Sequence, residues 1–263
     1  MELRAKALEK LAAGEGKPYL DKPADRVAAD GYYANVDPDR PDAVARLLQE
    51  THHERPRYSP AIELYPWVDL QPDRMVRSVY TLDEFDPREL IEEAAQIDEQ
   101  RESLRATAAS EAAVEELEPY NCEHVVCQSW FDHAEPMRGD LHHLFTCERK
   151  CNSFRGNAPY TDFPDYLEVV RESCGKKETD LFEPAAGKGA VARATFYFLL
   201  RYPELRPYSD ETITTLLQWH EAEPVSEYER HRNAAIFERQ GNRNPLIDHP
   251  DWAARIDFGA PAG

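Results

Sequence analysis

The sequence has no run of about 18 apolar residues, the length that a membrane-spanning helix needs, so we expect no membrane span. Its first residues, MELRAKALEKLAAGEGKPYLDKP, also lack the hydrophobic core of a signal peptide. Unless an upstream segment has been removed, the chain as written predicts a cytoplasmic protein.

Positive charge is scarce as well. Lys and Arg number 31 against 50 Asp and Glu, which gives a formal net charge of −19. A chain this acidic does not attract a polyanion over its whole surface. A site for such a partner would need a local concentration of positive charge, and four basic residues do lie close together: Arg138, Arg149, Lys150 and Arg155.

The chain is nevertheless long enough, at 263 residues, to bury a substantial core. Its 31% charged and 41% hydrophobic residues are typical of a globular protein. We expect residues 1–56 to form a polar N-terminal arm of packed helices, with helical stretches near Leu3–Ala12 and Pro41–His52. Residues 57–263 are expected to form the main domain.

Alternation of apolar and polar residues in 57–82 predicts two strands, AIELYPWVDL and RMVRSVYTL, around a turn. Asp86 as N-cap and Pro87 at the first position then predict a helix that runs to about Ala109. The acidic stretch that follows, Glu111 to Glu118, is interpreted as a solvated face. Further on, FYFLLRY predicts a buried helix.

Residues 121–157 concentrate residue types suited to chemistry on a phosphate: NCEHVVCQSWFDHAEPMRGDLHHLFTCERKCNSFRGN. The segment predicts a strand, a loop, a second strand and a helix, in that order. An oxygen ligand and an amide oxygen can hold a divalent ion on a phosphate, while a neutral imidazole deprotonates water. Glu123, His124 and Asn152 supply these groups, so the segment predicts hydrolysis of a phosphodiester bond.

This segment resembles the endonuclease I family of ββα-metal (His-Me finger) nucleases. The resemblance extends over about residues 57–253, through LYPWVDLQPD, RSVYT, FEPAAGKGAVARATFYFLLRYP and LLQWHEAEPVSEYERHRNAAIFERQGNRNPLIDHPDW. It implies an α+β fold in which a His-Me finger core is embedded in a mostly helical domain. It also implies a metal-dependent endonuclease that cuts DNA, and possibly RNA, with little sequence preference.

The resemblance assigns roles to three residues. Glu123 and Asn152 are expected to bind Mg²⁺ or another divalent cation, and His124 is expected to be the general base. An imidazole with an ordinary pKa near 6.5 is mostly neutral at pH 7, as a base must be. An isolated Glu-His pair would more often be a cap and a core histidine, but the ordered set of motifs favours the functional interpretation.

The two following histidines are expected to have different surroundings, because strand alternation would send them to opposite faces. We expect His143 to brace the loop that carries the base, with Asp140 and Asn157 also supporting the site from behind. His142 either contacts substrate or packs in the core.

Two arginines of the segment are candidates for phosphate binding. Arg155 either contacts the phosphate near the cut or forms an ion pair with an aspartate such as Asp140, since a bidentate guanidinium suits both. We favour the phosphate. Arg138 is a weaker candidate on what is expected to be a flexible loop.

Four of the five cysteines bracket the predicted finger, and the fifth is Cys174. One hypothesis is a structural Zn²⁺ site that holds the finger together. A second is disulfide bonds, for instance between Cys151 and Cys174, and a third is buried free thiols. The candidate zinc ligands are Cys122, Cys127, Cys147 and Cys151.

Two other functions compete with the nuclease hypothesis. A zinc-dependent hydrolase could draw its ligands from His124, His142, His143 and a cysteine. A non-catalytic nucleic-acid-binding module could keep the fold and use zinc only as a structural element. The sequence does not specify the oligomeric state.

Overall fold

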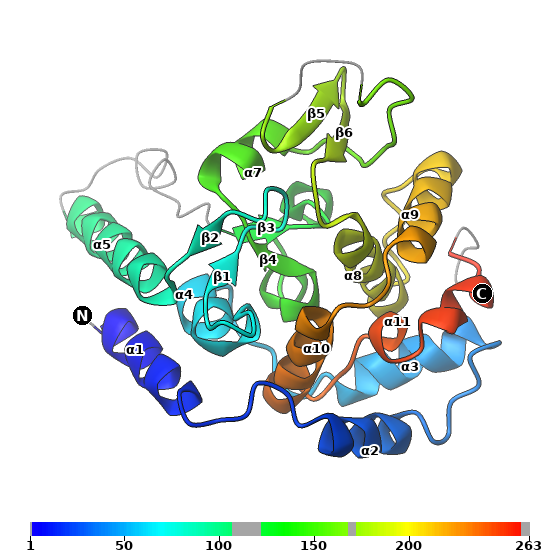
Figure 1. Ribbon diagram of the computed structural model, residues 1–263, viewed down its shortest axis with the longest axis horizontal. Coiled ribbons are helices and arrows are strands. Elements are labelled where there is room, and N and C mark those ends of the chain that lie inside the picture. The colour runs from blue at the N-terminus through cyan, green and yellow to red at the C-terminus, as the bar shows by residue number, and fades with distance from the viewer. Residues whose placement is uncertain (1, 107–121, 168–171, 259–263) are drawn as a thin grey trace.

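The computed structural model describes residues 2–106, 122–167 and 172–258 (Figure 1). The fold is α+β, as predicted, and helices dominate. The longer helices are α1 (Glu2–Gly14), α2 (Lys22–Tyr32), α3 (Pro41–Thr51), α5 (Pro87–Ala106), α8 (Lys188–Arg201), α9 (Asp210–Ala222) and α10 (Glu227–Gln240). In the described ranges no helix is both long and apolar enough to cross a membrane.

The strands within the described ranges form three antiparallel pairs. In each pair a strand is hydrogen-bonded to the next strand in the sequence, and the three pairs are separate sheets (Figure 1). They are β1 (Val76–Arg77) with β2 (Glu84–Phe85), β3 (Cys122–His124) with β4 (Leu144–Thr146), and β5 (Gly175–Glu178) with β6 (Leu181–Pro184).

The two helices predicted in residues 1–56 are present as α1 and α3. The sequence reading missed α2, which begins after Asp21, whose carboxylate accepts a hydrogen bond from the Ala24 amide. Helix α1 packs on α5, and α3 packs on α8. Ala7 and Val44 are fully buried in the two main hydrophobic clusters, so this segment contributes directly to the core.

The strand predicted for AIELYPWVDL is wrong. The chain there forms the short helix α4 (Pro60–Glu63) and the π-helical turn η1 (Leu64–Val68). Pro60 suits the first position of a helix, where no amide hydrogen is needed. Leu64, Tyr65 and Val68 are all buried, and a continuous apolar run of this kind does not distinguish a buried helix from a strand. In RMVRSVYTL only Val76–Arg77 is a strand.

Helix α5 begins as predicted. The Arg88 amide donates to the Asp86 carboxylate at 2.7 Å, and Pro87 is the first helical residue. The predicted end at Ala109 and the acidic stretch Glu111 to Glu118 lie outside the described residues.

The centre of the fold is α8, which is the buried helix predicted from FYFLLRY. Phe196, Tyr197 and Phe198 are fully buried along it, and α9 packs against it. The amide-rich segment after α10 forms a buried hydrogen-bond network. The Gln240 side chain donates to Asp140, and the Asn242 side chain donates to the Tyr197 hydroxyl at 2.6 Å.

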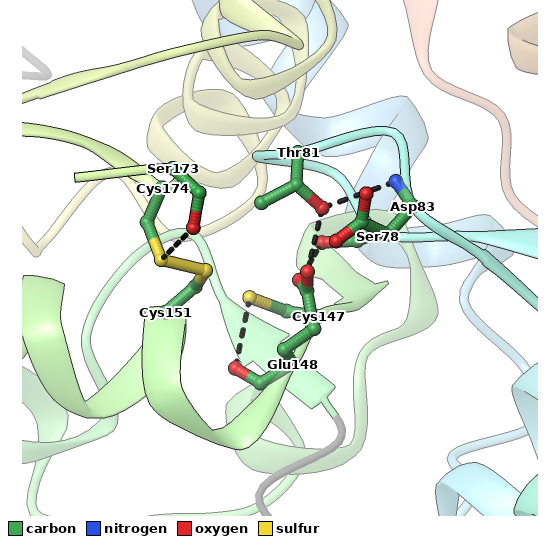
Figure 2. The surroundings of a disulfide bond; sticks show 8 residues. All are labelled: Ser78, Thr81, Asp83, Cys147, Glu148, Cys151, Ser173 and Cys174. Atoms are coloured by element: carbon green, nitrogen blue, oxygen red, sulfur yellow. Dashed lines mark hydrogen bonds between the residues drawn. A yellow bond between two sulfur atoms is a disulfide. The ribbon is translucent and has the colours of Figure 1, made fainter.

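A disulfide joins Cys151 to Cys174, with a Cα–Cα distance of 5.3 Å (Figure 2). It ties the helix α7 (Arg149–Arg155) to the chain just before β5. Glu148, at the start of α7, accepts hydrogen bonds from Ser78 and Thr81 (Figure 2). The helix is therefore anchored on two sides.

Candidate active site

The predicted order of strand, loop, strand and helix is present in residues 122–155. Strand β3 pairs antiparallel with β4, so that Glu123 lies opposite Phe145, and α7 follows β4 after two residues. Helix α7 ends at Gly156, whose φ of 57° is left-handed and favours glycine. This unit brings the end of β3 and the middle of α7 to the same place.

A cavity of about 270 Å³ lies between β3 and α7. Six predicted site residues line it: Glu123, His124, Asn152, Asn157 and the candidate zinc ligands Cys122 and Cys127. The remaining lining residues are Tyr58, Gln128, Ser153 and Gly156.

Only one of the two carboxylate oxygens of Glu123 is hydrogen-bonded to a described residue. Its Oε1 accepts from the Arg155 guanidinium and from the Tyr80 hydroxyl. Its Oε2 is buried and, among the described residues, has no hydrogen-bond partner. Burial raises the pKa of the Glu123 carboxyl above its usual value, and the charge of Arg155 opposes this rise.

His124 is fixed as a single tautomer by its partner. Its Nε2 lies 3.0 Å from the carbonyl oxygen of Arg138. Because a carbonyl only accepts, Nε2 carries the proton, and Nδ1 of the neutral ring keeps a lone pair. Burial lowers the pKa of His124 well below its usual value, so the ring is neutral at pH 7.

A backbone carbonyl also orients the Asn152 side chain. Its Nδ2 donates to the carbonyl oxygen of Cys122 at 3.0 Å, which leaves Oδ1 as an acceptor. The cavity therefore gathers three side chains that each retain a lone-pair atom. These atoms are Glu123 Oε2, Asn152 Oδ1 and His124 Nδ1.

The two oxygens match the preference of a hard divalent cation. A buried carboxylate oxygen without a partner is costly, and a cation would satisfy it. In the described part of the chain, no three His, Cys, Asp or Glu side chains form a metal-binding group. Mg²⁺ does not require one, because it keeps several waters and uses one or two protein ligands.

His142 and His143 do not lie on a strand. They belong to the 3₁₀ turn η4 (Leu141–His143), which Asp140 begins by accepting from the His142 amide at 3.2 Å. His142 is 3% exposed, donates from Nε2 to the Asn242 carbonyl and packs on Tyr197. His142 therefore packs in the core, which is one of its two expected roles, and does not line the cavity where it could contact substrate.

His143 packs against His124. Its ring centroid is 5.4 Å from that of His124, and its Nε2 donates to the Met137 carbonyl at 2.7 Å. Met137 directly precedes Arg138, whose carbonyl orients His124. Asp140 is fully buried. It accepts from the hydroxyls of Tyr197 and Tyr202 at 2.8 and 3.0 Å.

The expected contact of Arg155 with a phosphate is wrong in this structure. Arg155 is fully buried, and its partner is Glu123 and not Asp140. Its other hydrogen bonds go to the carbonyl oxygens of His124, Val125 and Ala158. Because all three nitrogens are used inside the fold, none is available to substrate.

The side chain of Arg138 is half-buried, with its guanidinium 5.1 Å from the ring centre of Tyr58. Tyr58 also packs on His124, at 4.9 Å between ring centres.

Tyr58 and Tyr80 could not be identified from the sequence, since a lone tyrosine carries no signal of its contacts. Tyr80 does fall within RSVYT, one of the segments of the family resemblance.

The expected zinc site with four cysteine ligands is not present, because one of the four cysteines forms a disulfide. Cys151 is bonded to Cys174 and cannot act as a thiolate ligand. Cys122, Cys127 and Cys147 are buried free thiols. Burial raises the pKa of the Cys127 thiol to about 11, so it is protonated at pH 7.

Comparison with known proteins adds an independent finding. The chain is 35% identical over 157 residues to an extracellular ribonuclease of Bacillus subtilis, covering 52% of this chain and 54% of that protein. It is 35% identical to an extracellular ribonuclease of Bacillus amyloliquefaciens, covering 52% and 53%. It is 29% identical over 123 residues to an extracellular deoxyribonuclease of Aeromonas hydrophila, covering 44% and 52%.

The chain thus spans about half the length of the curated relatives it matches. The sequence model of the endonuclease I family matches residues 43–251, which begins earlier than the resemblance at residue 57 and includes most of α3. With this match over most of its length, the chain belongs to the endonuclease I family.

Proposed function

We propose that this protein is a metal-dependent endonuclease that hydrolyses phosphodiester bonds with little sequence preference. One observation supports the proposal most strongly: Glu123, His124 and Asn152 line one cavity, and Oε2 of Glu123 is buried without a hydrogen-bond partner among the described residues. In this proposal β3, β4 and α7 are a His-Me finger core.

Each of the three residues has a distinct role. Glu123 and Asn152 hold a divalent cation, with Mg²⁺ the proposed ion, which neutralises the charge that builds on the phosphate in the transition state. His124 accepts the proton of the attacking water at Nδ1, and the Arg138 carbonyl holds the ring in the required tautomer. His143 braces the loop that carries that carbonyl.

The substrate is proposed to be DNA and also RNA. Relatives with comparable identity are named for ribonuclease and for deoxyribonuclease activity, which supports a site that recognises the phosphate and not the sugar. The net charge of −19 further predicts that binding is weak and sensitive to salt.

The compartment is proposed to be oxidising. A disulfide that joins α7 to the rest of the fold supports this, since such bonds persist outside reducing cytosol. The relatives named as extracellular nucleases support the same proposal.

Digestion of supercoiled plasmid and of single-stranded RNA tests the function. Wild-type protein with Mg²⁺ is expected to cut both, EDTA is expected to abolish cutting, and His124→Ala is expected to lower the rate at least about 100-fold. The control His53→Ala removes an exposed imidazole and should keep the wild-type rate. Activity with Zn²⁺ but not Mg²⁺ would favour the zinc-hydrolase alternative, and full activity of His124→Ala would refute the base assignment.

A further inference from the structure

Two buried groups that do not line the cavity hold the Glu123 carboxylate. The Arg155 guanidinium donates to Oε1, and the Tyr80 hydroxyl donates to the same oxygen at 3.0 Å. Tyr80 and Arg155 are both fully buried. Neither lines the cavity, so neither can contact substrate there.

A third residue fixes these two groups. The Tyr160 hydroxyl lies 2.7 Å from that of Tyr80, and because Tyr80 gives its proton to Glu123, Tyr160 must donate to Tyr80. The ring of Tyr160 also lies 4.4 Å beneath the Arg155 guanidinium. The orientation of the carboxylate thus depends on a connected network.

We propose that Arg155 and Tyr80 are positioning residues for the metal ligand Glu123, an inference that rests on the metal site of the proposed function. By taking both hydrogen bonds at Oε1, they leave Oε2 as the oxygen available to a cation. Arg155 also bonds the carbonyls of His124 and Val125, so the same guanidinium fixes the backbone that carries the base. One buried arginine thereby sets the relative position of the metal ligand and the base.

Direct metal binding tests this inference without substrate. Calorimetric titration of Mn²⁺ into wild-type protein, Tyr80→Phe and Arg155→Lys, with no nucleic acid present, gives the Kd of each. Loss of a group that orients a metal ligand typically weakens metal affinity about 10- to 100-fold. We expect the Kd to rise about 10-fold in Tyr80→Phe. We expect a larger rise in Arg155→Lys, since an ammonium cannot reproduce the planar fork of hydrogen bonds.

Tyr33→Phe is the matched control. Tyr33 is likewise buried and its hydroxyl donates to a carboxylate, that of Asp248 at 3.0 Å, but it does not line the cavity. Its Kd for Mn²⁺ should equal that of wild type, even if its thermal stability falls. Should Arg155→Lys fail to fold, Tyr80→Phe decides the question, because the substitution keeps the ring.

A wild-type Kd for Mn²⁺ in folded Tyr80→Phe would overturn the inference, even if the protein cuts DNA. Absence of Mn²⁺ binding in wild type would overturn it together with the metal site. A third outcome separates the two proposals. If wild type binds Mn²⁺ but cuts no nucleic acid, and Tyr80→Phe binds Mn²⁺ more weakly than wild type, the inference is upheld and the proposed activity is refuted.

Discussion

The carbonyl oxygen of Arg138 lies 3.0 Å from Nε2 of His124, and this contact determines which ring nitrogen can take up a proton. The next residue, Gly139, shows why the carbonyl lies there. A Cβ at Gly139 would lie 1.9 Å from the carbonyl oxygen of Pro56, so only glycine allows this approach of the two backbones.

Gly139→Ala is therefore expected to displace the Arg138 carbonyl and lower the cleavage rate at least about 10-fold, because His124 loses its orienting partner. Plasmid nicking with Mg²⁺ measures the rate, and circular dichroism checks the fold. Gly31→Ala is the matched control, since a Cβ at Gly31 meets no atom within 4 Å. Equal rates for Gly139→Ala and wild type would contradict the role of this contact.

The core of the candidate site could be predicted from sequence because its signal is local. Strand, loop and helix follow each other within 34 residues from Cys122 to Arg155, and Glu123, His124 and Asn152 all line one cavity. The role of Arg155 could not be predicted, because an arginine that binds phosphate and one that is buried against a carboxylate look alike in sequence. Only tertiary packing distinguishes them.

The error over residues 61–70 has a similar origin. The alternation in AIELYPWVDL predicts a strand, whereas α1, α5 and α10 all pack against η1, so little of η1 faces solvent. Pro66, inside this segment, also argues against a strand. The pairing of Cys151 with Cys174 was one of three open hypotheses, since spacing alone does not fix connectivity.

Removal of the disulfide is expected to destabilise the protein by about 3 kcal/mol, the loop-closure entropy for a loop of this length. The double variant Cys151→Ser, Cys174→Ser isolates this effect, and urea unfolding at pH 7 measures it. A reducing agent should lower the stability of wild type to a similar value and leave the double variant unchanged. Stability of the double variant equal to that of oxidised wild type would contradict a structural role for the bond.

Stability is also expected to fall as the pH drops below about 6.5, because buried histidines resist protonation. Burial lowers the pKa of His142 to about 4, whereas in the unfolded chain it is near 6.5. As the pH falls, His142 is therefore protonated in the unfolded state before it is protonated in the folded state. The contribution of His142 is complete above pH 6.5 and is lost progressively toward pH 4, by up to about 3 kcal/mol.

Urea unfolding at pH 7 and pH 5 measures this loss. In His142→Gln, which keeps an amide donor for the Asn242 carbonyl but does not titrate, the loss between the two pH values should be smaller than in wild type. The remaining loss is expected from other buried histidines, such as His143, whose pKa burial also lowers. An unchanged pH dependence in this variant would show that His142 is not the group responsible.

The most direct test of the account is the position of a bound cation. A crystal of the protein grown with Mn²⁺ and measured at the manganese absorption edge would locate the ion by its anomalous scattering. We predict one peak in the cavity, about 2.1 Å from both Glu123 Oε2 and Asn152 Oδ1, and next to the ring of His124. An empty cavity at saturating Mn²⁺, or a peak bound only by residues outside it, would contradict the proposed site.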